Sequence, residues 1–455
     1  MRKESVFYGR NKITIEREKG VMIVGIKKRF SKVLAMVTLA GTLILTGCGG
    51  SSESSNSSDK ITIDIMQGKV EFHSQFEELA EVYEKENPEV DINITSVGGG
   101  TDYLSQLKTK FASGDEPAIF SLFGPVEVEQ FKDDITDLSD MKAVELAFEG
   151  TLEAVTTEDG QVVGLPYNLE GYGLIYNKNV FEKAGINAEE IITYDDLEKA
   201  VKTLDSKKEE LGIEAVFALP GKEKWVMSNH LGNVYLAPEF NHNVLEAWNS
   251  PTVAFEKGEE FKRMLDLQAK YSIQPVLNLD YSQQVEQYFS LESVAMIQQG
   301  NWVYPSIEQM DADFAENGIG MIPIPVEGLE GHLPVGIPNF WAVNNNKDEK
   351  TIQAAKDFLD WLYTSEIGKD YVLNKFKFVP AYEGYDAEQI SDPLSRVVYE
   401  YSEKGKTIGW IFSGYPISWE PDTFGPNLQK YLDGKMSWDE LVEDSIKDWE
   451  ELRKK

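Results

Sequence analysis

Strand and helix patterns alternate along the chain from residue 60 onward, and this alternation constrains the fold more than any other feature. Ile61, Ile63 and Ile65 alternate with polar residues, which is the period of two expected for a strand. Further patterns predict a helix over 76–83, a strand over 90–94, a helix over 103–111 and a short buried strand over 118–122. This order predicts an α/β domain with a largely parallel sheet, whose ligand is expected at the carboxyl ends of the strands.

The same alternation returns in the second half of the chain. Thr193 with Asp196 predicts the start of one helix, and Ser437 with Glu440 predicts the start of another near the C-terminus. Apolar runs predict buried strands over 215–219 and 294–297 and a helix over 354–362. The sequence contains no internal repeat or heptad run, so we expect two α/β lobes.

The charge of the chain excludes several classes of partner. The first 47 residues have 10 basic and 3 acidic side chains, and the other 408 have 34 basic and 74 acidic ones, a net charge of −40. Such a surface repels phosphate backbones and anionic lipid headgroups, so nucleic acid is not expected as a partner. With 42% hydrophobic residues the chain can still build a core, and its length favours two or three domains.

Metal, cofactor and nucleophile chemistry has no support in the sequence. Cys48 is the single cysteine, which excludes a disulfide framework and a cysteine-based zinc site. The acidic stretch over 311–316 lacks the glycine of a calcium loop, and the glycines over 98–100 lack the following Lys-Ser/Thr of a phosphate-binding loop. The four histidines are not spaced as metal ligands: they are His73, His230, His242 and His332. We therefore expect no metal, no cofactor and no catalytic residue.

The N-terminal segment predicts export. Basic residues over 27–32 precede an apolar run over 33–45, which at about 13 residues is too short to cross a membrane. The run ends in Leu-Thr-Gly-Cys48, which resembles the lipobox of bacterial lipoproteins. That resemblance implies cleavage before Cys48, a diacylglycerol on its thiol, and residues 1–47 as a signal peptide. The alternative is a buried structural cysteine. Residues 48–59 then form a lipidated, Ser-rich tether, and Met22 is a candidate true start.

Four segments resemble the extracellular solute-binding proteins of ABC importers, in the carbohydrate-binding group that is similar to maltose-binding protein. One ends in Tyr176-Asn177-Lys178 and a second ends in Gly300-Asn301-Trp302. The third covers 334–344, and the fourth is the small-residue turn over 112–117. The order and spacing of the four are more specific than any one of them.

This resemblance implies a clamp of two discontinuous α/β lobes joined by hinge crossovers, as in type II periplasmic binding proteins. The first lobe would comprise residues 60–168 and 325–370, and the second residues 171–320 and 376–455. The chain would cross between lobes near Glu170, over 321–325 and over 369–380. The clamp would close over a solute and deliver it to membrane permease subunits.

A sugar ring has apolar C–H faces and a rim of hydroxyls, so its site needs aromatic side chains and a few hydrogen-bonding groups. Trp302 is the first candidate, because it follows a buried strand and matches the family's stacking tryptophan; the alternative is a packed core tryptophan. Glu170 at the first crossover is the second candidate, as an unpaired carboxylate, with a solvated surface glutamate as the alternative. Tyr172 lies two residues further on and serves either the ligand or the hinge packing.

Other candidates have weaker support from position alone. Trp225 lies in a charged stretch where a core tryptophan is unusual, so we expect it on an exposed loop. Trp341 is expected in the core. The remaining candidates follow strands or turns: they are Asn339, Phe340, Trp410, Phe123 and Glu71.

The sequence therefore predicts a monomeric, membrane-tethered receptor that delivers a neutral carbohydrate to an ABC importer. The high negative charge argues against phosphorylated or uronic-acid ligands, while cationic ligands such as polyamines stay open because carboxylates and aromatic rings also bind cations. An exported glycoside hydrolase acting through a carboxylate pair is the alternative from another class. A sensor subunit for a membrane kinase would share the fold.

Overall fold

The computed structural model describes residues 3–8, 11–18, 21–26, 60–70, 72–97, 103–148 and 150–454. The chain divides into two compact units, one up to Asn56 and one from Ser57 onward. The first unit contains a three-stranded antiparallel sheet of β1 (Lys3–Tyr8), β2 (Asn11–Glu18) and β3 (Val21–Ile26). The predicted signal segment after residue 26 and Cys48 lie outside the described residues. In the part of the chain that the structure describes, no helix is both long and apolar enough to cross a membrane.

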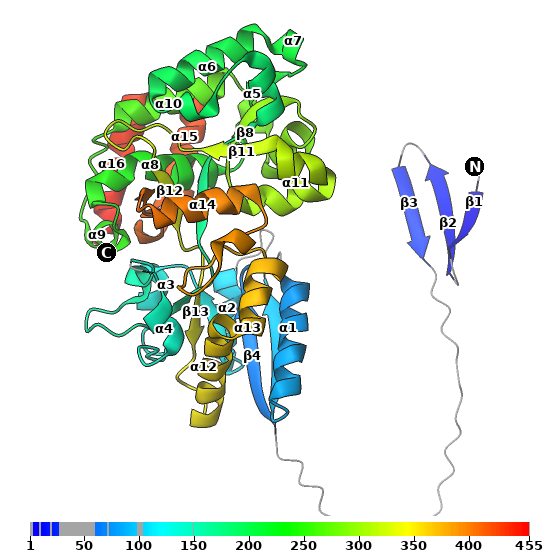
Figure 1. The fold of residues 1–455 in the computed structure, drawn as a ribbon, viewed down its shortest axis with the longest axis vertical. Coiled ribbons are helices and arrows are strands. Elements are labelled where there is room, and N and C mark those ends of the chain that lie inside the picture. The colour runs from blue at the N-terminus through cyan, green and yellow to red at the C-terminus, as the bar shows by residue number, and fades with distance from the viewer. Residues whose placement is uncertain are drawn as a thin grey trace, which may run out of the picture. The chain divides into compact units, whose positions relative to one another are not determined.

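The second unit consists of two α/β lobes, each built on its own sheet (Figure 1). The sheet of the first lobe has the order β5-β4-β6-β13-β7. Its strands are β4 (Ile61–Gln67), β5 (Val90–Ser96), β6 (Ile119–Leu122), β7 (Leu165–Pro166) and β13 (Phe340–Val343). Strand β4 is parallel to β5 and to β6, as the sequence pattern predicts, while β13 pairs antiparallel with β6 and β7.

Helices cover this first sheet because their apolar residues recur at helical spacing. On α1 the buried residues are those that the sequence pattern identifies, Phe76, Leu79, Ala80 and Tyr83. The helices of the first lobe are α1 (His73–Glu86), α2 (Tyr103–Ser113), α3 (Pro125–Gln130), α4 (Lys142–Leu146), α12 (Glu349–Thr364) and α13 (Glu366–Asp370). Trp341 is 1% exposed in the core of this lobe, as expected.

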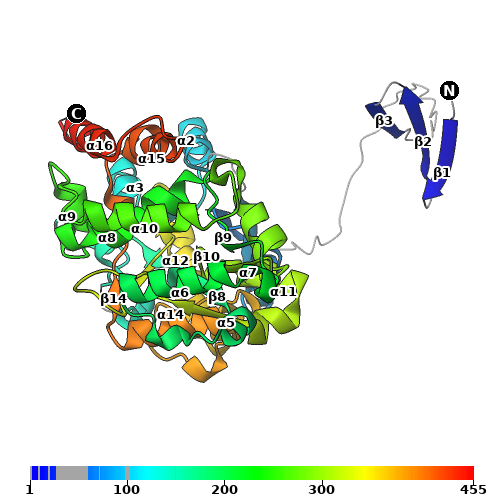
Figure 2. The ribbon, with the colours of Figure 1, turned by 90° about the horizontal axis from the view of Figure 1, so that it is seen from above.

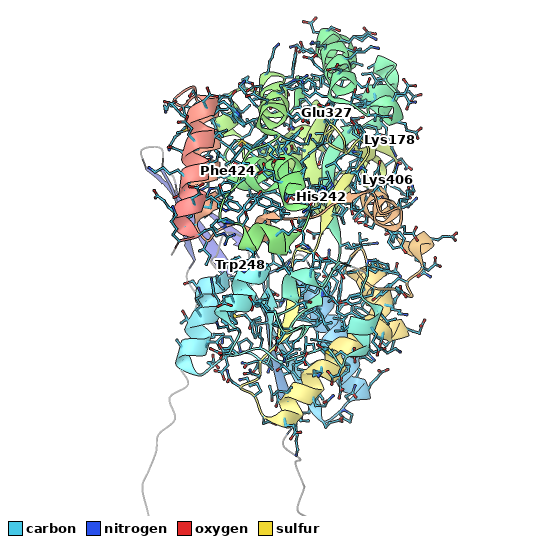
Figure 3. All side chains as sticks on the ribbon, turned by 90° about the vertical axis from the view of Figure 1, so that its left-hand side faces the viewer. Lys178, His242, Trp248, Glu327, Lys406 and Phe424 are labelled. Atoms are coloured by element: carbon cyan, nitrogen blue, oxygen red, sulfur yellow. The ribbon has the colours of Figure 1, made fainter. Side chains whose placement is uncertain are left out.

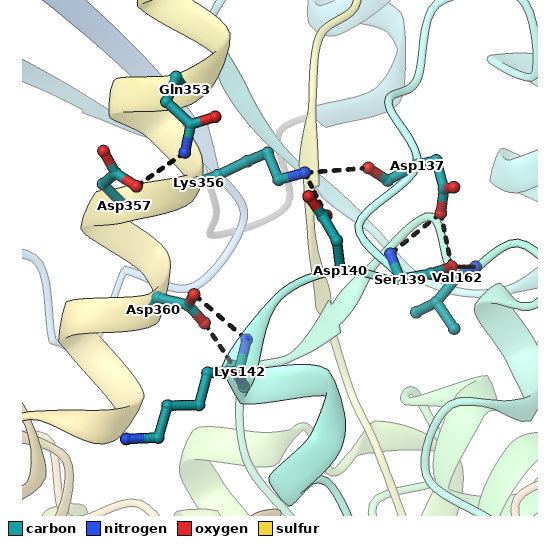
Figure 4. Close-up of polar contacts among 10 residues, drawn as sticks. Asp137, Ser139, Asp140, Lys142, Val162, Gln353, Lys356, Asp357 and Asp360 are labelled. Atoms are coloured by element: carbon teal, nitrogen blue, oxygen red, sulfur yellow. Dashed lines mark hydrogen bonds and ion pairs between the residues drawn. The ribbon is translucent and has the colours of Figure 1, made fainter.

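Side chains of α12 hold the segment that leads into α4 (Figure 4). The carboxylate of Asp360 accepts hydrogen bonds from the backbone N–H groups of Lys142 and Ala143 at 3.2 and 2.8 Å. Lys356, which lies one turn before Asp360 on α12, forms an ion pair with Asp140. The first turn of α4 is thus capped by a carboxylate that lies about 220 residues away in sequence.

The second sheet is mixed and has the order β14-β12-β8-β10-β9, with β11 also paired to β8. Its strands are β8 (Glu170–Asn177), β9 (Ala215–Phe217), β10 (Val294–Gly300), β11 (Ile319–Ile322), β12 (Leu333–Gly336) and β14 (Thr407–Ile408). Strand β8 is antiparallel to β10, β11 and β12, whereas β10 is parallel to β9 and β12 is parallel to β14.

Helices surround the second sheet, and Figure 2 shows α8 next to α10, which it contacts. The α-helices are α5 (Lys178–Ala184), α6 (Tyr194–Ser206), α7 (Lys208–Leu211), α8 (Gly232–Leu236), α9 (Val244–Asn249), α10 (Gly258–Lys270), α11 (Tyr304–Met310), α14 (Pro393–Glu403), α15 (Gly425–Leu432) and α16 (Trp438–Leu452). Both predicted capping boxes are present, Thr193 with Asp196 on α6 and Ser437 with Glu440 on α16.

Two crossovers differ from the positions that the family resemblance implies. The segment 333–336 forms β12, which pairs with β8 and β14, so these residues belong to the second sheet and the chain returns to the first lobe after Gly336. The residues from Phe376 to Tyr382 pack on the first lobe, because Phe376 and Phe378 lie 4.8 and 4.9 Å from the Phe72 ring. The last passage to the second lobe therefore falls between Tyr382 and the start of α14.

Candidate functional site

Six aromatic side chains of the second lobe converge on one position, and we call them the aromatic cluster: Tyr172, Trp225, His230, Trp302, Trp410 and Phe412. The predicted candidates Trp225, Trp302, Trp410 and Tyr172 all belong to it. The three tryptophans are half-buried, whereas Tyr172 is fully buried. Residues separated by up to 240 positions in sequence are thus brought to one place.

His230 lies at the centre of the aromatic cluster. Its ring stacks on Tyr172 at 4.3 Å with an interplanar angle of 10°. Trp225 and Trp302 lie 4.9 and 5.1 Å from it. The sequence pattern did not identify His230, because its place depends on the π-helical segment Val226–Leu231, whose wider turn brings position i+5 near Trp225.

Two tryptophan rings of the aromatic cluster lie close against glycines. A Cβ atom on Gly300 would fall 2.1 Å from Cζ3 of Trp302, and one on Gly336 would fall 2.4 Å from Cγ of Trp410. Any larger residue at either glycine would displace the ring. These glycines therefore fix how closely the two indoles approach strands β10 and β12.

A chain of buried amides holds Trp302 from the other side. Its indole Nε1 donates to Oε1 of Gln299 at 3.1 Å, and Nε2 of Gln299 donates to Oε1 of Gln284 at 2.7 Å. Nε2 of Gln284 in turn donates to the carbonyl of Ala218 at 2.7 Å. Each of these three donors has an acceptor, so the plane of the Trp302 indole is fixed without any ligand.

Glu170 does not have the unpaired carboxylate that the sequence pattern led us to expect. Its Oε1 pairs with Nζ of Lys69, and the two side chains are only 9% and 13% exposed. Lys69 follows β4 in the first lobe and Glu170 begins β8 in the second, so this ion pair joins the lobes at the first crossover. The carboxylate is neutralised rather than free.

Four buried polar atoms at the crossovers and in the aromatic cluster have no hydrogen-bond partner among the described residues. Nδ1 of His230 and Nε1 of Trp410 are buried without a hydrogen-bond partner among the described residues. The same holds for Oδ1 of Asn168 and Oδ1 of Asn339, whose residues are 2% and 7% exposed. Buried polar atoms are nearly always hydrogen-bonded, so these four atoms are candidates for contact with a bound molecule.

The remaining candidates have different surroundings. Phe340, a candidate ligand contact, is 2% exposed in the core of the first lobe with Leu122 and Val155, so its ring is not available to a ligand. Trp225 is half-buried at the start of a helical segment, not on an exposed loop, and its Nε1 donates to Glu223 at 3.3 Å. Phe123 is half-buried against Tyr103. Glu71 lies outside the described residues.

The first lobe meets the second beside the aromatic cluster. A Cβ atom on Gly124 would fall 2.8 Å from Cβ of Ser413, the residue after Phe412. Asn243 donates to Oε2 of Glu153 across the same boundary at 2.9 Å. Trp248 also lies where the lobes face each other (Figure 3). The aromatic cluster is therefore at the junction of the lobes, with Phe123 on the opposite side.

Burial makes His230 an acid-sensitive residue. Desolvation lowers the pKa of His230 from 6.5 to about 3, so the ring is neutral at pH 7. Below pH 6.5 the imidazole takes up a proton in the unfolded chain, whereas in the folded chain it stays neutral until the pH approaches 3. The stability that this group contributes is therefore present above pH 6.5 and is lost as pH falls toward 3.

We expect His230→Phe to remove this acid sensitivity. Relative to its value at pH 7, the free energy of unfolding of the wild type should fall by about 2 kcal/mol more than that of the variant at pH 5. Urea unfolding of both proteins at pH 7, 6 and 5 measures the difference. Equal pH profiles would show that His230 is not held neutral by burial.

The chain belongs to the family of bacterial extracellular solute-binding proteins, whose sequence pattern matches residues 69–369. It is 21% identical to the multiple sugar-binding protein of Streptococcus mutans over 362 residues, which cover 75% of this chain and 81% of that protein. It is 24% identical to the melibiose/raffinose/stachyose-binding protein MelE of Bacillus subtilis over 329 residues, with 70% and 74% covered.

Solved structures share the fold. A chitin oligosaccharide binding protein superposes with a TM-score of 0.72 at 23% identity, covering 87% of this chain and 100% of that chain. The apo form of RafE from Streptococcus pneumoniae superposes with a TM-score of 0.70 at 20% identity, covering 87% and 98%. The prediction of two α/β lobes with the fold of type II periplasmic binding proteins is thereby confirmed.

Proposed function

We propose that this protein captures a neutral oligosaccharide at the junction of its two lobes. The observation that supports this most is the aromatic cluster, in which three half-buried tryptophans surround buried polar atoms that have no partner among the described residues. Indole faces suit the C–H faces of sugar rings, and unpaired amide, imidazole and indole atoms suit their hydroxyls. Relatives named for multiple sugars and for raffinose agree with this ligand class.

The charges at the junction favour a neutral ligand over a cation. The carboxylate that would hold an amine, Glu170, is already paired with Lys69, and the central ring of His230 is neutral. The same ion pair weighs against a glycoside hydrolase, because a general acid or nucleophile needs a carboxylate that is available to the substrate. The family consists of binding proteins, and we propose no catalytic activity for this chain.

The proposed receptor acts outside the cytoplasm as a monomer tied to the membrane. Its lobes would close over the sugar, and the closed form would dock on the permease subunits of an ABC importer. Residues 1–47 would serve as the signal peptide, and Cys48 with the Ser-rich segment up to residue 59 as the lipid anchor and tether. The net charge of −40 outside the signal segment keeps this domain from associating with anionic headgroups directly.

A thermal-shift panel tests the ligand class. Raffinose, stachyose and chitin oligosaccharides, together with a polyamine and a uronic acid, are each added to the protein in large excess. A neutral sugar present at 100 times its Kd should stabilise the fold by about 2.7 kcal/mol and raise the unfolding midpoint by about 1–3 °C. A rise with the polyamine or the uronic acid alone would contradict a neutral-sugar site. Release of monosaccharide into the supernatant would support the hydrolase.

A further inference from the structure

We propose that His230 determines specificity in this site by forming a hydrogen bond from its ring nitrogen Nδ1 to a hydroxyl of the bound sugar. This inference rests on the proposed carbohydrate function and assigns it a residue that the sequence pattern did not identify. His230 is 7% exposed, and Nδ1 has no partner among the described residues.

Tyr172 sets the position of the His230 ring. One face stacks on Tyr172, and the hydroxyl of Tyr172 donates to the backbone carbonyl of His230 at 2.8 Å. Both the side chain and the backbone of His230 are thus fixed by one neighbouring residue. A buried polar atom that is held in place and left unpaired is unfavourable for folding, which indicates that it has a purpose beyond folding.

The surroundings of His230 match the chemistry of a sugar ring. Trp225, Trp302 and Trp410 lie 4.9 to 6.1 Å from the imidazole, and all three are half-buried. A ligand that parts these rings on entering would find apolar faces around one hydrogen-bonding atom. A neutral imidazole has one donor and one acceptor nitrogen, and a hydroxyl can pair with either.

The backbone around His230 also departs from regular structure. Residues Val226–Leu231 form a π-helix between Trp225 and α8. Such segments are less stable than an α-helix and occur frequently at functional sites, where they re-aim a side chain. Here the wider turn places His230 beside Trp225, so the local irregularity has a consequence at the site.

The neighbouring carboxylate of Glu223 is directed elsewhere. Its Oε2 accepts the indole N–H of Trp225 at 3.3 Å and its Oε1 accepts the backbone N–H of Tyr281 at 3.3 Å. It therefore holds the start of the helical segment that carries Trp225. Both of these hydrogen bonds of Glu223 are to groups other than the imidazole of His230.

Two variants of His230 and one control test the inference by calorimetric titration with raffinose, stachyose and chitin oligosaccharides. His230→Phe keeps a stacked ring and removes both nitrogens, whereas His230→Asn keeps a polar atom near the position of Nδ1. His332→Phe is the matched control, because His332 lies outside the aromatic cluster. We expect about tenfold weaker binding for His230→Phe, and binding within about threefold of the wild type for His230→Asn and His332→Phe.

A measurement without ligand separates the binding role from a structural one. If the nitrogen is retained for binding, His230→Phe should unfold at the same temperature as the wild type at pH 7, or about 1–2 °C higher. A midpoint lower by several degrees would overturn the inference, because it would show that the ring nitrogens stabilise the fold. If His230→Phe does not fold, His230→Leu, which is smaller and also lacks both ring nitrogens, makes the same comparison, with the same expected loss of about tenfold.

The outcomes also distinguish the inference from the function on which it rests. If the wild type binds one of the sugars and His230→Phe binds it equally well, the role of His230 is overturned and the receptor stands. If the wild type binds none of them, the proposed ligand class fails and the inference fails with it.

Discussion

Trp302→Ala should weaken sugar binding by about 30- to 1,000-fold, equivalent to about 2–4 kcal/mol. The indole is positioned without a ligand, because it lies against Gly300 and its Nε1 donates to Gln299. Truncation removes the area on which a sugar ring would stack, and it lets water into the aromatic cluster.

Trp361→Ala is the matched control for this loss. Trp361 is also a half-buried tryptophan, but it belongs to α12 of the first lobe and packs on Tyr83 at 5.1 Å, away from the aromatic cluster. Its variant should keep the affinity of the wild type, even if its unfolding temperature falls. Calorimetric titration of both variants measures the difference, and equal losses of affinity would contradict a stacking role for Trp302.

Glu170→Gln should lower the free energy of unfolding by about 3–5 kcal/mol. The variant leaves the largely buried ammonium group of Lys69 without its carboxylate, and removing one member of a buried ion pair is more harmful than removing both. The ammonium group also lies 5.6 Å from the centre of the Phe378 ring, so it is held within the packing of the crossovers. Urea unfolding measures the loss.

Two further variants show whether burial is the cause. Lys69→Met combined with Glu170→Gln removes both charges and should recover most of the stability that the single variant loses. Glu81→Gln breaks the exposed pair with Lys85, in which both side chains are 73% exposed, and should leave the unfolding midpoint unchanged. A double variant as unstable as Glu170→Gln would mean that the amide itself, rather than the unpaired ammonium, disrupts the crossover.

Much of the fold follows from local pattern. The spacing of Phe76, Leu79, Ala80 and Tyr83 predicts the buried face of α1, and the capping boxes at Thr193 and Ser437 predict where α6 and α16 begin. The pairing of β12 with β8 is different, because it depends on contacts between residues more than 160 positions apart. No local pattern shows that β12 stays in the second sheet while the next strand, β13, pairs with β6 in the first.

The candidate site was predictable for its tryptophans but not for their surroundings. Trp302, Trp225 and Trp410 follow strands or precede a helix, so position alone identifies them. His230 needs the π-helical turn to reach Trp225, and a helical pattern with a period of 3.6 residues does not place it there. Likewise, the partner of Glu170 is Lys69, which lies in the other lobe, and 101 residues separate them.

The most direct test of the account is a tryptophan-fluorescence titration of the protein with the neutral oligosaccharide that gives the largest thermal shift. Three tryptophans lie in the aromatic cluster, so a sugar that binds there must change their emission. The account predicts saturation at one sugar per chain, with the change lost in Trp302→Ala and kept in Trp361→Ala. Saturable binding with unchanged emission, or the same change in Trp302→Ala, would place the sugar elsewhere and contradict the account.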